Sequence, residues 1–359
     1  MSKYPELVVD LKKLERNIKY IKEKCDEKDI KVAAVIKGFN ADFDIVKKYD
    51  EVGIPILASS RLDQLEPLMG KVKAKLMTIR IPMISEAGDV VRITDISLNS
   101  DIEVLKALND EAQKQNKVHN VILMKDLGDL REGFWDDDEL ITASCFVEGA
   151  SNLHLLGIGT NLGCYGAIVP TVEKLEELVL SASKVEAEIG RSLEYISGGA
   201  TSSFPRVLEG NIPSRINLLR IGEAFIIPSV LKDDWNCDYK YTDEIFKLSA
   251  EVIEIKSKPS HPIGEIFKDA FGNKPVYEDL GIRKRALIAL GKADYVFLDK
   301  LILKEEGAFL VGASFDHTII DVTNAKRDIK VGDVIEFGLS YSTLVYLSNS
   351  NNIHKVYIE

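Results

Sequence analysis

Short apolar runs alternate with amphipathic segments along the first two-thirds of the chain. Eight of these runs have the length and the β-branched content of strands that are buried on both faces. They lie at residues 31–37, 55–60, 73–82, 95–99, 120–126, 153–161, 193–198 and 216–222. Helical periodicity fills most of the intervals and is clearest at residues 101–115 and 171–189. Eight strand–helix units in about 230 residues predict an α/β fold, a (β/α)₈ barrel of the TIM type.

The pattern changes after residue 235, where helical periodicity fades and strand-like runs are separated by Gly, Asp and Asn turns. These runs lie at residues 246–255, 286–290, 295–298, 308–311, 318–322, 331–337 and 355–358. They predict a second, all-β domain that follows the barrel in the chain. We therefore expect a barrel domain at 8–235 and a β domain at 236–359. An N-terminal strand within residues 1–10 is assigned to the β domain, because the barrel does not need it.

Composition and charge narrow the possible partners. The chain has 359 residues, of which 45% are hydrophobic, so it can bury a large core. Its net charge of −11 comes from acids and bases mixed along the chain, which argues against nucleic acid or an anionic membrane as a partner. It has no apolar run of membrane-spanning length, no N-terminal signal pattern, no CxxC pair and no metal-ligand spacing of histidines. We expect a cytoplasmic protein with reduced thiols and no metal site.

A lysine ends the first strand-like run, Lys31-Val-Ala-Ala-Val-Ile-Lys37. Burial disfavours the charged form of an amine, so such a lysine needs a reason to be there. It either reaches solvent where the strand stops, or it is a Schiff-base lysine whose amine is kept deprotonated and nucleophilic. The run alone fits both interpretations. The residues at the other strand ends can distinguish them, because barrels carry their functional groups there.

Two loops of small residues follow the seventh and eighth predicted strands. The first is Gly198-Gly199-Ala-Thr201-Ser202-Ser203, and the second begins at Arg220-Ile-Gly222. Each could be a plain turn, but in barrels these two loops commonly bind phosphate through backbone N–H groups and hydroxyls. A phosphate site together with a buried lysine points to pyridoxal phosphate, bound as a Schiff base with its ring nitrogen facing a charged group.

Taken in order, these segments resemble the alanine racemase family of fold-type III pyridoxal-phosphate enzymes, and within it the ornithine racemase-type branch. The run ending at Lys37 is similar to the family's Schiff-base lysine strand. The segment 125–133, Lys-Asp-Leu-Gly-Asp-Leu-Arg131-Glu-Gly, is similar to one whose arginine lies beside the cofactor's phenolic oxygen. The family's phosphate-binding tyrosine after the lysine is replaced here by Ala41 or Asp42.

The resemblance also assigns the remaining cofactor contacts of the barrel. Arg220 is expected to meet the pyridine nitrogen, and the N–H of Gly222 to meet the phosphate, with Ser202 and Ser203 in the same phosphate loop. Asn161 stands where the typical member has the histidine of a Thr-His pair near the pyridine ring, a replacement expected in the ornithine branch.

The β domain carries two further similar motifs. Gly312-Ala-Ser-Phe315-Asp316-His317 and the residues up to Asp321 resemble a family motif that reaches across a dimer interface into the partner's active site. Leu339-Ser-Tyr341 resembles a late Ser-Tyr pair whose phenol binds phosphate. The resemblance therefore implies a homodimer whose active sites are completed across the interface.

The second proton-transfer group is not where the family usually has it. The usual tyrosine of a Gly-Tyr-Ala-Asp-Gly stretch is replaced by Lys292 in Gly291-Lys-Ala-Asp294-Tyr. Three candidates remain, namely His317, Cys164 and Lys292, of which we favour His317, because histidine exchanges protons near neutral pH. A hydrogen-bonded strand histidine and a structural buried thiol are the alternatives for the first two.

The resemblance implies an amino-acid racemase that interconverts the L and D forms of a basic amino acid such as ornithine. Phe315, Asp316 and Asp294 are the expected substrate contacts, the two carboxylates being suited to an amino group. Two other functions stay open on the same scaffold. One is a pyridoxal-phosphate carrier protein without racemase activity, and the other is a decarboxylase or aldolase of the same fold type.

Overall fold

The chain forms two compact units. The computed structural model describes residues 3–237, 239 and 244–359. One unit is Leu14–Asp243, here called the barrel unit, and the other combines Met1–Lys13 with Glu244–Glu359, here called the β unit. The boundaries expected from the sequence lie a few residues N-terminal of this division at both ends of the barrel.

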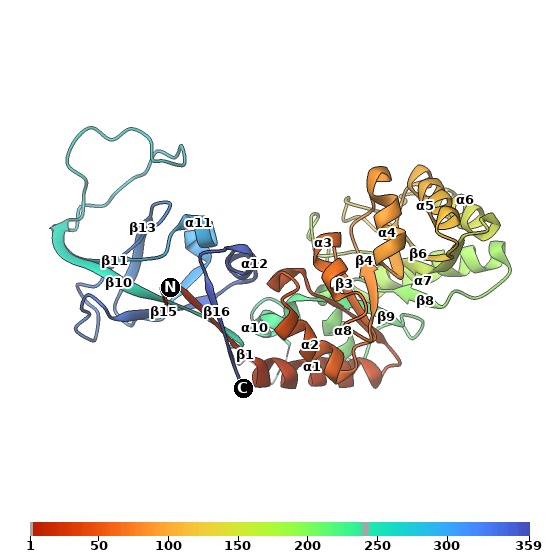
Figure 1. The fold of residues 1–359 in the computed structure, drawn as a ribbon, viewed down its shortest axis with the longest axis horizontal. Coiled ribbons are helices and arrows are strands. Elements are labelled where there is room, and N and C mark those ends of the chain that lie inside the picture. The colour runs from red at the N-terminus through yellow and green to blue at the C-terminus, as the bar shows by residue number, and fades with distance from the viewer. Residues whose placement is uncertain (1–2, 238, 240–243) are drawn as a thin grey trace. The chain divides into compact units, whose positions relative to one another are not determined.

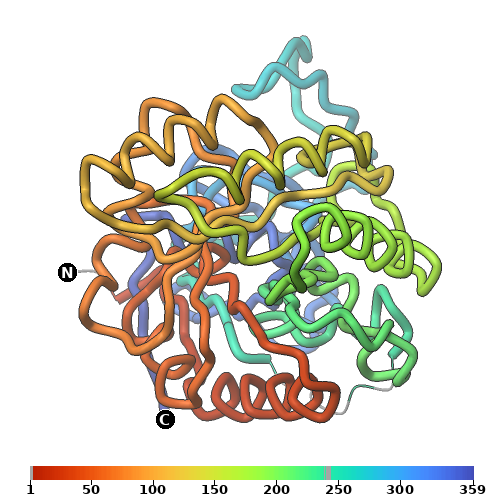
Figure 2. Tube along the Cα trace, turned by 90° about the vertical axis from the view of Figure 1, so that its right-hand side faces the viewer, coloured from red at the N-terminus to blue at the C-terminus, as the bar shows by residue number. Residues whose placement is uncertain are grey.

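Eight parallel strands close the barrel in chain order. They are β2 (Lys31–Val35), β3 (Ile56–Ser59), β4 (Lys75–Thr78), β5 (Ile96–Asn99), β6 (His119–Met124), β7 (Leu153–Gly159), β8 (Tyr195–Ser197) and β9 (Leu218–Ile221). The ring closes where Val32 of β2 is in register with Leu219 of β9. In Figure 2 the trace of this unit passes from red through yellow to green around the strands. All eight predicted strands are present, and the predicted fold class is confirmed.

Helices precede, connect and follow the strands of the barrel. The α-helices are α1 (Leu11–Asp26), α2 (Phe43–Val52), α3 (Leu62–Leu65), α4 (Ala87–Ile93), α5 (Ile102–Lys114), α6 (Asp137–Gly149), α7 (Val172–Ile189), α8 (Phe204–Leu208), α9 (Glu223–Ile226) and α10 (Ser229–Asp233). The shorter 3₁₀ turns are η1 (Lys37–Phe39), η2 (Glu66–Leu68), η3 (Ile84–Glu86) and η4 (Thr201–Ser203). The two clearest predicted helices are α5 and α7, and α7 begins where the Thr171 hydroxyl accepts from the N–H of Lys174. In the described part of the chain, no helix has the length and apolar character needed to cross a bilayer.

The interior of the barrel is apolar from its floor up to the strand ends. The side chains that fill it come from Ala33, Val35, Ile56, Ala58, Met77, Ile96, Leu98, Ile122, Met124, Leu156 and Leu218. Arg220 follows Leu218 by two residues on β9, so its side chain points to the same inner face, and it is buried. The packed interior leaves no room for polar side chains below the strand ends. This arginine lies at the strand ends, where barrels carry their functional groups.

The β unit is built on one mixed sheet. Its strands are β1 (Glu6–Asp10), β10 (Phe246–Pro259), β11 (Ile282–Ile288), β12 (Leu301–Leu303), β13 (Phe309–Ala313), β14 (Thr318–Asp321), β15 (Val334–Leu339) and β16 (His354–Ile358). The sheet order is β12-β15-β10-β11-β14-β13, and β1 pairs with both β10 and β16. Figure 1 shows β10 and β11 as a long ribbon from which the connection between them extends as a loop.

One predicted strand of the β unit is wrong. Residues 295–298 do not form a strand, because α11 (Lys292–Tyr295) occupies the start of this segment and η5 (Leu298–Lys300) its end. The carboxylate of Asp294 accepts from the N–H of Gly291 at 3.3 Å and holds the first turn of the helix. Local capping therefore overrides the β propensity of the apolar residues that follow.

Two further elements of the β unit were not expected from the sequence. The strand β12 is only three residues long, and the helix α12 (Tyr341–Asn349) follows β15 directly. The Ser340 hydroxyl begins this helix by accepting from the N–H of Thr343, and Thr343 Oγ1 accepts in turn from the N–H of Ser340. This reciprocal cap was the sequence signal for the helix.

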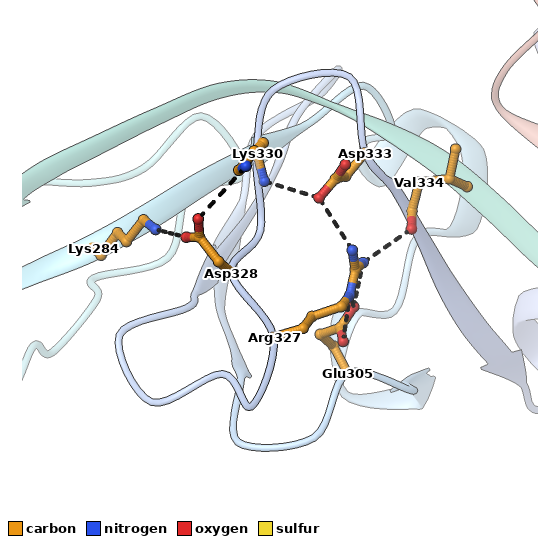
Figure 3. Close-up of polar contacts among 7 residues, drawn as sticks. All are labelled: Lys284, Glu305, Arg327, Asp328, Lys330, Asp333 and Val334. Carbon is orange, nitrogen blue, oxygen red and sulfur yellow. Dashed lines mark hydrogen bonds and ion pairs between the residues drawn. The ribbon is translucent and has the colours of Figure 1, made fainter.

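Ion pairs hold the loop between β14 and β15 against its neighbours (Figure 3). Arg327 pairs with Glu305 at 2.6 Å and with Asp333 at 3.1 Å, while Asp328 pairs with Lys284 at 3.0 Å. Exposed pairs of this kind contribute roughly 0–1 kcal/mol each, so their effect is to fix the course of the loop more than to stabilise the unit.

The close approach of β7 and β8 predicts a large effect of a single methyl group. A Cβ atom at Gly157 would lie 2.0 Å from the carbonyl oxygen of Tyr195, its partner in the ladder. We expect Gly157→Ala to destabilise the protein by about 1–3 kcal/mol, because backbone must move to admit the side chain. The matched control is Gly149→Ala at the end of α6, where no atom lies within 4 Å. It should stay within about 1 kcal/mol of the wild type. Urea unfolding followed by circular dichroism measures both, and equal midpoints for the two variants would contradict this account.

Candidate functional site

Lys37 is the first residue of the turn η1 and follows directly on β2, at the C-terminal end of that strand. Burial lowers the pKa of its amine. Nearby ionisable groups act on the same pKa, with Cys164 and Glu132 raising it and Arg131 lowering it. Among the described residues, the Lys37 amine has no hydrogen bond or ion pair. A larger share of this amine is therefore neutral at a given pH than for an exposed lysine, as a nucleophile or base requires.

Arg220 lies buried at the end of β9 and is held by two hydrogen bonds. Its Nη1 donates to Ser197 Oγ at 2.6 Å, and its Nη2 donates to the carbonyl oxygen of Thr160 at 2.9 Å. Burial lowers the pKa of Arg220 to about 10, so the guanidinium remains charged at neutral pH. No carboxylate of the described chain lies within ion-pair distance of it. A buried cation without an anionic partner is costly, which makes this group a strong candidate for contact with a ligand.

The small-residue loop after β8 packs against the end of β9. The Thr201 hydroxyl accepts from the N–H groups of Gly222 and Ala224 at 3.3 and 3.4 Å. The Ser202 hydroxyl donates to the carbonyl of residue 162, and that of Ser203 to the carbonyl of residue 198, both at 2.7 Å. The two N–H contacts are long, so an anion can replace them, whereas both serine hydroxyls already have acceptors. Backbone N–H groups are thus the readier anion donors here.

Gly222 leaves room for this packing. A Cβ atom at this position would meet Val35 Cβ at 3.0 Å and the Val35 carbonyl oxygen at 3.3 Å. Glycine allows the end of β9 to pass close to β2, which brings the loop of Thr201 near the strand that carries Lys37. The sequence therefore has glycine here for the close approach of two backbones.

Two buried polar atoms at the end of β7 lack partners. They are Thr160 Oγ1 and Asn161 Nδ2, and neither has a hydrogen-bond partner among the residues that the structure describes. An unsatisfied buried polar group costs about 1–3 kcal/mol. Both atoms follow the strand whose end supplies the carbonyl acceptor for Arg220. The strand end therefore has the donors expected around a polar aromatic ring, and these residues fit the predicted cofactor.

The loops after β6 and β7 are tied together and carry a further cation. The carboxylate of Asp129 accepts from three backbone N–H groups of the β7 loop at 3.0–3.3 Å, beginning with that of Cys164. Arg131 Nη1 lies 2.9 Å from the Cys164 sulfur. The guanidinium of Arg131 also pairs with Glu132 through two hydrogen bonds. Glu132 acts electrostatically on Lys37 and on Arg220 as well, so one carboxylate serves three cations.

In the β unit, the turn between β13 and β14 carries Phe315 and Asp316 at its exposed tip. His317 follows, with Nδ1 at 3.4 Å from Ser314 Oγ. Lys292 lies beside the turn, because its N–H donates to the carbonyl of Ser314 at 3.0 Å. One surface of the β unit therefore carries four of the residues predicted to transfer a proton or to contact the substrate, namely Lys292, Phe315, Asp316 and His317. Asp294 is not among them.

Lys292 also contacts the long loop between β10 and β11. Its amine lies 4.2 Å from the centre of the Phe271 ring, a cation–π contact. The same lysine contributes to the lowered pKa of Asp269, whose main causes are hydrogen bonds within its own turn, the largest from Asn273. The amine is thus held beside an aromatic ring and a carboxylate.

Asp294 and Tyr341 lie elsewhere in the β unit. Asp294 is buried, and its carboxylate accepts from Ser350 Oγ at 2.8 Å and from Asn352 Nδ2 at 3.3 Å, in addition to the N–H that starts α11. These contacts give Asp294 a structural task, and its carboxylate is not open to a substrate within this unit. Tyr341 is the first residue of α12 and is half-buried.

The barrel unit brings together every cofactor residue predicted for it. These are Lys37, Arg131, Asn161, Ser202, Ser203, Arg220 and Gly222, together with the candidate Cys164. Sequence reasoning missed the roles of Thr160, Thr201, Ser197 and Glu132. Thr201 and Glu132 lie inside the loop segments quoted above, and Thr160 ends the predicted strand 153–161 together with Asn161, so these three could have been found from the sequence. The pairing of Ser197 with Arg220 depends on a contact between β8 and β9 that the sequence does not reveal.

The N-terminal domain model of alanine racemases matches residues 9–229. An ornithine racemase of Acetoanaerobium sticklandii is 40% identical over 354 residues, covering 98% of this chain and 99% of the relative. The chain belongs to the alanine racemase family. A lysine racemase of Thermotoga maritima is 37% identical over 356 residues, covering 99% and 98%. An alanine racemase of Clostridium tetani is 26% identical over 344 residues, covering 91% and 84%.

Solved alanine racemases share the whole fold of this family member. The enzyme from Bacillus anthracis with bound L-Ala-P has a TM-score of 0.78 at 18% identity, over 100% of this chain and 96% of that one. The enzyme from Bartonella henselae with covalently bound pyridoxal phosphate has a TM-score of 0.74 at 16% identity, over 98% and 99%. The family inferred from the sequence is confirmed, and the expected enzyme class, an amino-acid racemase, agrees with all three relatives named above.

The cluster of cations predicts how Lys37 responds to the loss of Glu132. The carboxylate of Glu132 raises the pKa of Lys37, so Glu132→Gln should lower that pKa further and increase the neutral fraction of the amine at any pH below the midpoint. Competitive acetylation of Lys37 in the cofactor-free protein, read by mass spectrometry across pH, measures the midpoint. The control is Glu139→Gln on the exposed face of α6. A midpoint that moves to higher pH in Glu132→Gln would refute this electrostatic account.

Proposed function

We propose that this protein is a pyridoxal-phosphate-dependent racemase that interconverts the L and D forms of a basic amino acid such as ornithine or lysine. The observation that carries the proposal is that two cationic side chains lie at the same end of the barrel. One is the half-buried amine of Lys37, whose pKa is lowered, and the other is the buried guanidinium of Arg220, which has no anionic partner among the described residues. The choice of a basic substrate is supported by the two relatives of 40% and 37% identity, which are named ornithine racemase and lysine racemase.

The residues at the strand ends have distinct tasks in holding the cofactor. Lys37 would bind its aldehyde carbon covalently, and Arg220 would face its ring nitrogen. Gly222 and the loop of Thr201 would offer N–H groups to its phosphate, a task the family resemblance also gives to Tyr341. Arg131 would lie at the phenolic oxygen. When bound, pyridoxal phosphate acidifies the α-proton of an attached amino acid by accepting electron density into its ring.

Arg220 has an electronic role as well as a binding role. A guanidinium whose pKa is about 10 keeps its own proton near neutral pH, so Arg220 would donate a hydrogen bond to the ring nitrogen of the cofactor and would not protonate it. Arg220 would thereby limit how much electron density the ring withdraws from the substrate carbon. This restraint favours simple return of the proton over side reactions.

Racemisation needs one proton-transfer group on each face of the substrate carbon. Lys37 takes or returns the proton on one face, since its burial favours the neutral amine. We propose His317 for the other face, because it lies on an accessible turn beside Phe315 and Asp316. Two other residues are alternatives for this second proton-transfer group. Cys164 lies in the barrel unit, and Lys292 lies in the β unit beside the turn of His317.

A homodimer follows from this assignment as part of the proposal. The turn of His317 belongs to the β unit, and the family resemblance directs this motif into the barrel of a partner. Sedimentation of the loaded enzyme should give a dimer, and a fully active monomer would contradict the proposal. The cytoplasmic location expected from the sequence stays a prediction.

The two other functions considered for this scaffold predict different products. A cofactor carrier would bind pyridoxal phosphate and leave amino acids unchanged, and a decarboxylase would release carbon dioxide. The β unit with its exposed turn favours an enzyme over a carrier, since a carrier has no use for groups that approach a substrate.

The central test is made on the cofactor-loaded protein. Borohydride reduction followed by peptide mapping should find the cofactor on Lys37, and Lys37→Ala should reduce turnover by at least about 10⁴-fold, because both the covalent link and one proton-transfer group are lost. The wild type is incubated with L-ornithine, L-lysine and L-alanine in deuterium oxide. We expect loss of optical rotation with α-deuterium uptake for the two basic amino acids. Carbon dioxide release, or no change in any substrate, would reject the racemase.

The group on the second face can be identified by separating exchange from inversion. Without that group, Lys37 still exchanges the α-proton of one enantiomer, but inversion stops. We expect His317→Gln to retain exchange for one enantiomer while racemisation falls by roughly 10²–10⁴-fold, the usual contribution of a general acid or base. Cys164→Ser and Lys292→Met are the matched controls. The assignment is wrong if one of them shows this split and His317→Gln does not.

A further inference from the structure

The turn that carries Lys37 has an unusual backbone. Asn40 and Ala41 both adopt the left-handed region, with φ of 55° and 49°. For residues other than glycine this conformation costs on the order of 1–2 kcal/mol each, and Ala41 has no polar side chain to compensate locally. Two such residues in succession persist only where the surrounding structure imposes them, and here they directly follow the turn of the reactive lysine.

The strained turn closes across Lys37. The N–H of Asn40 donates to the carbonyl of Lys37 at 3.1 Å, and the N–H of Ala41 donates to the carbonyl of Ile36 at 3.0 Å. The peptide groups on both sides of the Lys37 Cα are therefore bound by the two left-handed residues. Any relaxation of their φ angles moves the Cα of Lys37 and the direction in which its side chain leaves the strand.

A buried side-chain network holds this turn from the neighbouring strand. Gln64 Nε2 donates to Asn40 Oδ1 at 2.9 Å, and Gln64 Oε1 accepts from Ser59 Oγ at 2.5 Å. Ser59 is the last residue of β3, which pairs with β2. Gln64 is buried in α3, a helix of only four residues. The network links the strained turn to the rigid edge of the barrel through a single carboxamide.

We propose that Asn40 and Gln64 are positioning residues that fix the backbone at Lys37 and thereby the place from which its amine acts. The inference rests on the proposed function, because it presumes that this amine is the reactive group. Neither residue touches substrate or cofactor in this scheme. The ionisable groups that act on the pKa of Lys37, namely Arg131, Glu132 and Cys164, lie on other loops, so changes at Asn40 and Gln64 leave them in place.

The barrel unit offers a matched control network. Ser97 Oγ contacts His119 Nε2 at 2.8 Å and accepts from Asn99 Nδ2 at 2.9 Å, and all three side chains are buried. Ser97 and Asn99 alternate with the interior residues of β5, so they face the helix layer and not the end of the barrel. Ser97→Ala therefore removes a buried hydrogen bond of the same kind without touching the Lys37 turn.

The test compares Gln64→Met, Asn40→Gly and Ser97→Ala with the wild type. In the cofactor-free proteins, the pH midpoint of Lys37 acetylation should rise in the first two variants, because an amine released from its half-buried place regains solvent. In the loaded enzymes, kcat should fall on the order of 10- to 100-fold with KM within about 3-fold, as expected for a reacting group displaced by about 1 Å. Ser97→Ala should leave kcat and KM within about 2-fold of the wild type and the pH midpoint of Lys37 acetylation unshifted.

The design keeps each outcome decisive. Asn40→Gly tolerates the left-handed φ, so it removes the anchor without adding strain, and it serves if Gln64→Met does not fold. An unchanged Lys37 midpoint in the anchor variants, or an equal shift in Ser97→Ala, overturns the proposal. Failure of borohydride to link the cofactor to wild-type Lys37 would instead reject the proposed function, since the midpoints are measured without cofactor.

Discussion

The interior of the barrel is packed with apolar side chains, so every charged group of the site lies at the strand ends. The buried guanidinium of Arg220 is the group most affected by this constraint. Its two protein partners are a hydroxyl and a carbonyl, which orient the group without neutralising it. Lys37 lies at the end of the adjacent strand, and Arg131 reaches the same region from the loop after β6. Glu132 is the carboxylate that acts on all three cations. The site thus has an excess of positive charge that suits an anionic ligand with a basic aromatic nitrogen.

The backbone arrangement around these cations depends on close contacts between strands. Gly222 lets the end of β9 pass beside Val35, and the Thr201 hydroxyl then reaches the N–H groups that follow. Asp129 joins the loops after β6 and β7 in a similar way, through three backbone N–H groups. Each strand end is therefore fixed by its neighbour. A side chain at one end is placed by residues far from it in sequence, and this mutual bracing gives a ring of short strands the rigidity that proton transfer needs.

Much of this could be predicted from sequence, for definite physical reasons. Strands buried on both faces give continuous β-branched runs, so all eight were found, and a lysine that ends such a run is conspicuous because burial opposes its charge. The failures have reasons too. Residues 295–298 look like a strand, but the Asp294 cap begins a helix just before them. The expected substrate contact of Asp294 stays a prediction, and within the β unit its carboxylate accepts from Ser350 and Asn352. The bond from Ser197 to Arg220 and the network of Gln64 depend on tertiary contacts that no local pattern encodes.

The β unit is drawn from both ends of the chain, since β1 pairs with β10 and, in parallel, with β16. During synthesis the ribosome releases β1 first, but its second neighbour does not exist until residues 354–358 have been made. The contiguous barrel segment can fold in the meantime, as domains generally do in the order of their emergence. The order of translation therefore sets an order of assembly, in which the module with the lysine is complete before the sheet that carries His317 can close.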